Sequence, residues 1–312
     1  MTRTQPRFGQ ISFDDTDPVG QVLSTETGSM NWEWGLEGRV GYRFCNDMQI
    51  EGVYWGIFSN DSETTVFATD LVGNLNTVFD FSPVNIGADN VNDLYDAAAA
   101  HRIRRSYEFH NIELNLLGGQ LEPACGNRLA VSWLSGVRYF RLDEAFQYAS
   151  ADVDPVFGAD PDNEAYYDID VENNLLGFQI GGRADLSVTN SLQFYVAPKL
   201  GIYNNHISHQ SRIYNANGVA VVGPGNPLAG QAFDIRTSDD VFSVMAEVDL
   251  GLNWQITHRW SANVGYRLVA ITDVALSTDQ IPANFADIPG VADIDSDASL
   301  LLHGAYAGVE FR

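Results

Sequence analysis

The chain has 312 residues, which is enough for one large β-barrel or two ordinary domains. Its formal net charge of -24, from 41 acidic and 17 basic residues, argues against a nucleic-acid partner, whose phosphates need basic side chains. The 28 glycines, 17 phenylalanines, 13 tyrosines and 6 tryptophans favour strands. No apolar run reaches the 18 or more residues of a transmembrane helix. If this chain spans a membrane, it must therefore do so as a closed β-barrel.

The first residues, MTRTQPRFGQISF, are basic but include no apolar core of a signal peptide. We interpret residues 1–29 as an N-terminal remnant with an acidic loop, from which a signal peptide and an upstream strand are missing. Residues 30–312 are predicted to form a single β-barrel domain.

Residues 30–44 (MNWEWGLEGRVGYRF) alternate apolar and polar side chains and predict the first clear strand. The apolar set is predicted to face outward: Trp34, Leu36, Val40 and Tyr42. The alternate set is predicted to face inward: Glu33, Glu37, Arg39 and Arg43.

The same alternation predicts eight further strands. They cover residues 49–59, 106–117, 129–142, 175–188, 192–203, 244–255, 260–269 and 299–311. Nine strands are thus visible, and an intact single-chain bacterial barrel would have ten, because its strand number is even.

Short and long connections alternate between these strands. The short ones lie at residues 45–48, 118–127, 189–191 and 257–259, and the long ones at residues 59–103, 143–174, 215–240 and 273–299. The long connections together with residues 8–29 hold 30 of the 41 acidic residues. The predicted fold is therefore an all-β, antiparallel, up-and-down transmembrane β-barrel with short periplasmic turns and long acidic extracellular loops.

Alternation alone does not distinguish a membrane barrel from a soluble barrel with its faces reversed. Aromatic residues near the ends of the apolar stripes favour the membrane, because interfacial girdles are aromatic. The predicted girdle comprises Trp32, Trp34, Tyr42, Trp254 and Trp260. The strands also exceed the usual soluble length, and the polar stripe mixes charges with glycine. The predicted location is the bacterial outer membrane, with membrane lipid as partner.

The polar stripes predict a ladder of charges along the lumen. Its members are Glu33, Glu37, Arg39, Arg43, Glu113, Arg138, Arg183, Asp185, Lys199, Glu247, Asp249 and Arg267. Such a ladder is either the eyelet of a pore or a plug of ion pairs. Since about ten strands leave little room inside and buried charges must be paired, we expect an occluded lumen.

Several stretches resemble a planctomycete-type outer-membrane family, β-barrel porin family seven. They are GLEGRVGYRFCNDMQIEGVYWG, HNIELNLL, SGVRYFRLDE and NNLLGFQIGGRADLSVTNSLQFYVAPKLGIYNNHISHQSRI. The resemblance covers most of the chain from about residue 31 onward. It implies an exported barrel protein, and it defines fold and location better than activity.

Cys45 and Cys125 lie in the first and second short turns. An oxidising periplasm allows a disulfide between them, provided that the two Cα atoms approach within about 6.8 Å. The alternative is two free or metal-binding thiols.

Other polar groups have ordinary explanations beside functional ones. Two acidic runs could bind calcium through oxygen ligands, although neither follows the EF-hand pattern: Asp293, Asp295 and Asp297; and Asp152, Asp154, Asp160, Asp162 and Glu164. His206 and His209 resemble a metal or catalytic pair, but a spacing of three puts them on opposite faces of a strand. Three arginines could contact lipid phosphates at the outer rim or balance the acidic loop: Arg102, Arg104 and Arg105.

Three functions remain open. The first is a structural or surface-interaction barrel with a charge-paired, largely occluded lumen, whose loops could meet divalent cations or cell-surface partners. The second is a narrow porin-like channel for ions or small solutes. The third, an outer-membrane hydrolase, lacks a recognisable constellation of catalytic residues in the sequence. We therefore expect no enzyme activity and no cofactor, and conductance measurements would separate the first two functions.

Overall fold

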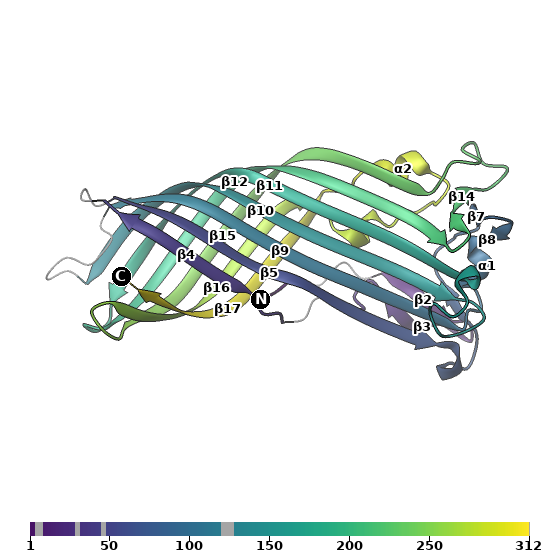
Figure 1. The fold of residues 1–312 in the computed structure, drawn as a ribbon, viewed down its shortest axis with the longest axis horizontal. Coiled ribbons are helices and arrows are strands. Elements are labelled where there is room, and N and C mark those ends of the chain that lie inside the picture. Colours follow the sequence, from purple (N-terminus) through teal and green to yellow (C-terminus); the bar gives the residue numbers. More distant parts are fainter. Residues whose placement is uncertain (4–8, 29–31, 45–47, 120–127, 312) are drawn as a thin grey trace.

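The computed structural model describes residues 1–3, 9–28, 32–44, 48–119 and 128–311. Nine long strands form one antiparallel sheet in chain order, curved into a barrel (Figure 1). They are β4 (Leu36–Arg43), β5 (Met48–Phe67), β9 (Ala100–Gly119), β10 (Leu129–Ala151), β11 (Glu164–Ser187), β12 (Leu192–Asn215), β15 (Asp234–Gln255), β16 (Trp260–Val274) and β17 (Ala298–Phe311). Two short strands join this sheet: β1 (Thr2–Arg3) on β17 and β13 (Gly218–Val219) on β12. The predicted all-β antiparallel fold with nine visible strands is confirmed.

The strands begin or end close to the predicted positions at the short-turn end, but several extend much further at the other end. Strands β10 and β11 pair without interruption from Leu129↔Leu186 to Ala151↔Glu164. The connection predicted over residues 143–174 is therefore only residues 152–163. The first strand is shorter than predicted, since β4 begins at Leu36 rather than at residue 30.

The long strands reverse the polarity of their two faces part-way along. On β12 the outward side chains are mostly apolar in residues 192–202 and mostly polar in residues 204–214. The inward side chains change in the opposite sense, from Lys199 to Ile207. The strand β11 does the same, with outward Asp168 and Asp170 followed by exposed Phe178. The sequence analysis assumed that the apolar side chains of a strand stay on one face. Because they change faces at this reversal, the outer halves of the long strands were not predicted.

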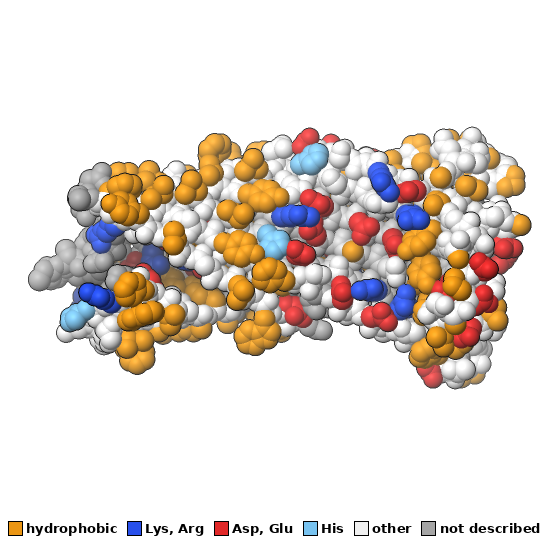
Figure 2. All heavy atoms as spheres, in the orientation of Figure 1, with side chains coloured by type: hydrophobic (Ala, Val, Ile, Leu, Met, Phe, Trp, Pro, Cys, Tyr) orange, Lys and Arg blue, Asp and Glu red, His pale blue; other side chains and the backbone are white. Residues whose placement is uncertain are grey.

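We call the outward apolar part of the long strands the apolar band. On β10 it runs over eleven residues, 129–139, which agrees with the roughly 9–11 residues of a tilted transmembrane strand. Its exposed members include Trp133, Val137, Ile180 and Leu200. Figure 2 shows hydrophobic side chains gathered over this half of the molecule, and most of the acidic side chains over the other half, where hydrophobic ones also occur.

The outer ends of the strands are covered by a cap built from the long connections and from residues 10–24, which precede β4. The cap contains β2 (Gln10–Asp14), β3 (Asp17–Ser24), β6 (Leu75–Thr77), β7 (Val84–Ile86), β8 (Asp89–Asn90), β14 (Val221–Val222), α1 (Val91–Tyr95), α2 (Ile288–Ala292) and the 3-10 turns η1 (Ala68–Asp70), η2 (Pro161–Asn163) and η3 (Ser277–Gln280). Its buried side chains, such as Phe81 and Phe285, pack on the inward Tyr148 and Tyr167 of the barrel wall. Among the described residues the helices lie only in these connections, and none is long and apolar enough to cross a membrane.

The barrel interior is layered. Level with the apolar band lies a layer of charged side chains, described below. Further outward lies an apolar layer, in which Trp55, Phe109, Phe140, Tyr203 and Met245 pack together. The cap follows beyond it. The lumen is therefore not polar along its whole length: in the outer half the outward face is polar and the inward face has become the core.

Candidate functional site: a charge layer inside the barrel

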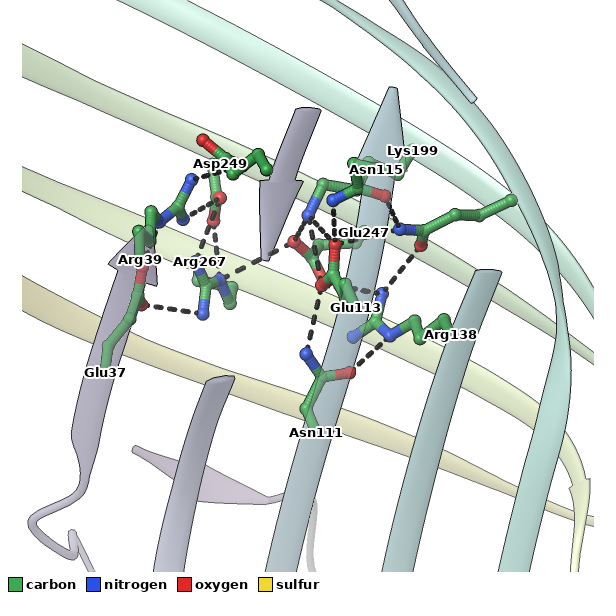
Figure 3. Close-up of polar contacts among 12 residues, drawn as sticks. Glu37, Arg39, Asn111, Glu113, Asn115, Arg138, Lys199, Glu247, Asp249 and Arg267 are labelled. Atoms are coloured by element: carbon green, nitrogen blue, oxygen red, sulfur yellow. Dashed lines mark hydrogen bonds and ion pairs between the residues drawn. The ribbon is translucent and has the colours of Figure 1, made fainter. Parts of the chain in front are cut away.

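The charge layer consists of inward side chains from seven strands, at one level of the barrel. Its members are Glu37 and Arg39 of β4, Glu51 of β5, Glu113 of β9, Arg138 of β10, Lys199 of β12, Glu247 and Asp249 of β15, and Arg267 of β16. Each lies on the inward phase of its strand, because successive side chains alternate between the two faces. The close-up in Figure 3 shows most of these side chains pointing toward one another across the lumen.

Lys199 stands at the centre of one half of the layer. Its Nζ lies 2.9 Å from Glu113 Oε2 and 2.9 Å from Glu247 Oε1. Glu113 also accepts hydrogen bonds from the amides of Asn111, Asn115 and Gln179. Both carboxylates are essentially inaccessible to solvent. For Glu113, the three amides and the ammonium group of Lys199 take the place of water.

Arg138 reaches the same carboxylates from the opposite side. Its Nη1 lies 2.8 Å from Glu247 Oε2 and 3.8 Å from Glu113 Oε1, while its Nε donates to Asn111 Oδ1. Two cations therefore meet two carboxylates in a space closed to water, and each of the four charges has a partner of opposite sign.

Arg267 organises the other half of the layer. It forms a two-pronged pair with Asp249, at 2.7 and 3.0 Å, and its Nη1 lies 3.0 Å from Glu37 Oε2 on β4. Arg39 bonds Glu37 at 2.5 Å and lies 3.6 Å from Asp249. Since the sheet edges β4 and β17 come together in the curved sheet, these contacts tie β4 to β15 and β16 on the inside of the place where the edges meet.

The remaining ladder residues do not join this network through the contacts that the structure describes. Arg183 pairs with Asp185 on its own strand and stacks over the ring of Tyr195 rather than reaching across. Glu33 contributes backbone hydrogen bonds to Met1. Arg43 has a partner as well.

Sequence analysis missed the tyrosines that lie between the charges. Tyr195 and Tyr306 hydrogen-bond through their hydroxyls at 2.5 Å. They cover the inward glycines Gly251 and Gly265, where an added Cβ would meet these side chains at about 2.5–2.6 Å. An inward glycine opposite an inward tyrosine is a signal of such covering, because a large ring fills the space that the glycine leaves.

The predicted girdle residues lie on the outside of the barrel. Trp34 is 93% exposed, and Trp32, Tyr42, Trp254 and Trp260 are exposed too. Trp32 also meets the outward ring of His303 edge-on. Cys45 and Cys125 lie outside the described residues, so their disulfide remains a prediction.

A second buried ion pair lies on the barrel wall, between β9 and β10, and hydrogen-bonds to the cap. Arg105 and Glu144 are fully buried, with 2.7 Å between Nη2 and Oε1. Arg105 also donates to the carbonyl of Thr25, and Ser277 donates to Glu144. Of the two alternatives left open for Arg105, contact with lipid phosphates is wrong, because its side chain lies on the inward phase of β9. Its neighbour Arg104 is outward and pairs with Asp61.

Beneath the cap, a buried cluster brings together a hydroxyl and an imidazole, the residue types of a nucleophile (Ser12) and a base (His101). Ser12 Oγ lies 2.8 Å from His101 Nδ1 and 3.0 Å from the Tyr148 hydroxyl, and His101 Nε2 lies 3.0 Å from the Tyr95 carbonyl. Ser12, His101 and Tyr148 are 0% exposed. Burial lowers the pKa of His101 to about 3, so the ring is neutral and serves as a packed hydrogen-bonding group.

The acidic runs considered for calcium are not gathered into a site. Within the described parts of the chain, no three acidic, histidine or cysteine side chains come close enough to hold a metal ion. Glu164 is instead buried and hydrogen-bonds the backbone of Gly158 and the Tyr166 hydroxyl. His206 and His209 lie on opposite faces, with His206 outward beside Asp240 and His209 buried.

The antiparallel strands, the apolar band and the inward charges define the class of this protein: an outer-membrane β-barrel. The family model described as beta barrel porin-7 (BBP7) matches residues 36–308, and the chain belongs to this family. The resemblance seen in the sequence is confirmed at this level. No curated protein sequence matches the chain. Among solved structures it is similar to the outer membrane protease OmpT from Escherichia coli, with a TM-score of 0.47 and 10% identity over 89% of this chain and 82% of that chain.

Proposed function

We propose that this protein is a structural or surface-interaction barrel whose lumen is occluded, rather than a channel or an enzyme. The proposal rests on one observation: three successive layers of side chains fill the inside of the barrel. A solute moving along the axis would meet the charge layer, then the apolar layer, then the cap.

The charge layer supports occlusion because its ions bind one another. Arg138, Lys199 and Glu247 are each within hydrogen-bonding or ion-pairing distance of partners and nearly inaccessible to solvent. Separating such pairs to admit a solute would leave charges uncompensated, at a cost of several kcal/mol per ion.

The apolar layer supports occlusion independently. Phe109, Phe140 and Leu142 are 0% exposed, and Trp55 is 4% exposed. Ions would have to pass through this packed region without water, which is the most costly environment for charge.

The outer surface supports a role in contacts with other molecules. Many of the cap's acidic side chains are exposed, including Asp154, Asp287, Asp293 and Asp295. An exposed anionic surface attracts cationic partners and divalent ions. The apolar band supports membrane lipid as the other partner.

The test is the conductance of the purified, folded protein in planar bilayers. We expect no stepwise currents after insertion has been verified by protease protection in vesicles. A matched variant, Trp55→Ala with Phe140→Ala, thins the apolar layer and reports whether that layer limits ion passage. Reproducible single-channel steps from the unmodified protein would overturn the proposal and establish the channel.

A further inference from the structure

The short-turn end of the barrel holds a small pocket between two neighbouring turns. It lies where residues 190–193 lead into β12 and where residues 253–261 leave β15 and enter β16. These three strands pair with one another at this level, from Gln193↔Asn253 to Asn253↔Asn263. The pocket is therefore part of the barrel mouth inside a continuous wall, and it is not a gap between strand edges.

The lining of this pocket is polar, and part of it is unpaired. Ten residues form the lining, of which four carry amides and three carry hydroxyl groups. The amides belong to Asn190, Gln193, Asn253 and Gln255. Asn253 is only 6% exposed, yet its side-chain amide forms no hydrogen bond within the described part of the chain. A buried amide without a partner is costly unless water or a ligand supplies the missing bonds.

Arg259 gives the pocket a positive charge. Its side chain lies in the lining, and no acidic residue that the structure describes pairs with it. Two inward acidic residues of this end are already engaged. Asp185 pairs with Arg183 at 2.9 Å. Glu310 accepts a hydrogen bond from a serine of the lining and has a further partner. Figure 2 shows basic side chains at this end of the molecule, whereas acidic ones predominate at the opposite end. An unpaired guanidinium beside unpaired amides favours an anionic ligand, because hydrogen bonds to a charged group are the stronger ones.

The volume of the pocket selects among anions. It has room of about 30 Å³ for the centres of water-sized atoms. One water needs about 10–15 Å³ on this measure, so the pocket accepts two oxygen atoms side by side. A carboxylate presents two oxygens in one plane, which is also the arrangement that a guanidinium group binds with two parallel hydrogen bonds. A phosphate group carries further oxygens and is too large to enter whole.

We propose that this pocket binds the terminal carboxylate of a small periplasmic molecule, with Arg259 as its cationic partner. Asn253 and Gln193 donate to the carboxylate from inside the mouth. The ligand class is an N-acylated amino acid or the C-terminal end of a peptide. Exposed Asn190 and Gln255 offer donors and acceptors to the amide that stands next to such a carboxylate. The short turns of an outer-membrane barrel face the periplasm, so the ligand comes from that side.

The test uses the full chain, isotope-labelled, in detergent micelles. N-acetylalanine is titrated in, and the side-chain amide signals of Asn253 and Gln193 are followed by NMR. We expect shifts that saturate, whereas N-acetylalaninamide, which has no carboxylate, should cause none. Arg259→Gln should weaken the binding of N-acetylalanine by about tenfold or more, because charge-assisted hydrogen bonds are lost. The matched control is Arg128→Gln, which should leave the affinity unchanged, since Arg128 is exposed at the same end but does not line the pocket.

Saturable shifts that require both the carboxylate and Arg259 support the proposal. Three results would overturn it: no saturable shift, equal shifts with N-acetylalaninamide, or equal weakening by Arg128→Gln, which would mean that the general positive charge of this end attracts anions. Inorganic phosphate is titrated as well, and binding as tight as that of N-acetylalanine would overturn the assignment to a carboxylate. The pocket lies on the short-turn side of the charge layer, so none of these outcomes depends on conductance. Failure here therefore leaves the proposed occluded lumen unaffected.

Discussion

Lys199 of β12 donates hydrogen bonds to both carboxylate oxygens of Glu113 of β9, at 3.2 and 2.9 Å, although two strands separate them in the sheet. One side chain thus spans the interior between non-adjacent strands. This is possible only where the barrel is narrow. The charge layer therefore links strands that are not neighbours in the sheet. The same layer determines how the barrel should respond to substitution.

Substitution of Arg138 by Ala should destabilise the barrel strongly. The change leaves Glu247 and Glu113 with one cation fewer in a region closed to water, and breaking a buried pair in this way typically costs about 3–5 kcal/mol. The free energy of unfolding in urea, measured in lipid vesicles, provides the check. The matched control on the same strand is Arg141→Ala, whose half-exposed ion pairs are worth about 1 kcal/mol or less. Equal losses in the two variants would contradict the role of the layer.

Substitution of Phe178 by Arg should impair insertion into bilayers. Phe178 is 70% exposed within the apolar band of β11, where a lipid-facing charge costs about 2–4 kcal/mol near the bilayer midplane. Asp170→Arg, also outward on β11 but beyond the band, should insert normally. The fraction of protein that resists extraction from vesicles measures both. A barrel whose outer half were in the membrane would show the opposite order.

Acid should loosen the cap through His101, which lies on β9 well outside the apolar band. Its pKa is about 3 in the folded protein and about 6.5 when exposed. Between these values the unfolded state binds a proton that the folded state does not. The contribution of His101 to the free energy of unfolding is therefore fully present above pH 6.5. It falls by about 1.4 kcal/mol per pH unit as the pH drops toward 3.

Amide exchange of the cap, compared between the unmodified protein and His101→Gln, isolates this contribution. The variant should lose part of its stability at neutral pH and show a shallower decline between pH 6.5 and 3. An unchanged pH profile would mean that His101 is not the group responsible.

Addition of a methyl group at Gly251 should also destabilise the barrel. A Cβ there would lie 2.6 Å from the Tyr195 hydroxyl and 2.6 Å from the carbonyl oxygen of Val264, and the backbone atom cannot move aside. Overpacking of this kind costs about 1–3 kcal/mol. Gly38→Ala is the matched control, since nothing lies within 4 Å of its Cβ position. Thermal unfolding in detergent, followed by loss of strand signal, should separate the two variants.

Alternation in the sequence was enough to locate the nine long strands and to assign their side chains to one face or the other. Period-two alternation is local, so residues such as Glu37, Arg138 and Lys199 could be assigned inward from their own strand alone. It also determined the alternation of short and long connections, since turn residues interrupt the pattern where the chain reverses.

Tertiary structure alone decided where each strand ends at the outer side and which charges meet. The outer half of a strand such as β12 buries Ile207 only because the cap folds over it, so its core face is created by residues distant in the chain. In the same way, the partners of Arg138 and Arg267 depend on the curvature of the whole sheet. Arg105 illustrates the limit most clearly: its sequence context resembles an exposed basic rim, yet the approach of Glu144, Thr25 and Ser277 buries it. Alternation defines the two faces of a strand, but the core is created by whatever the fold brings against each face.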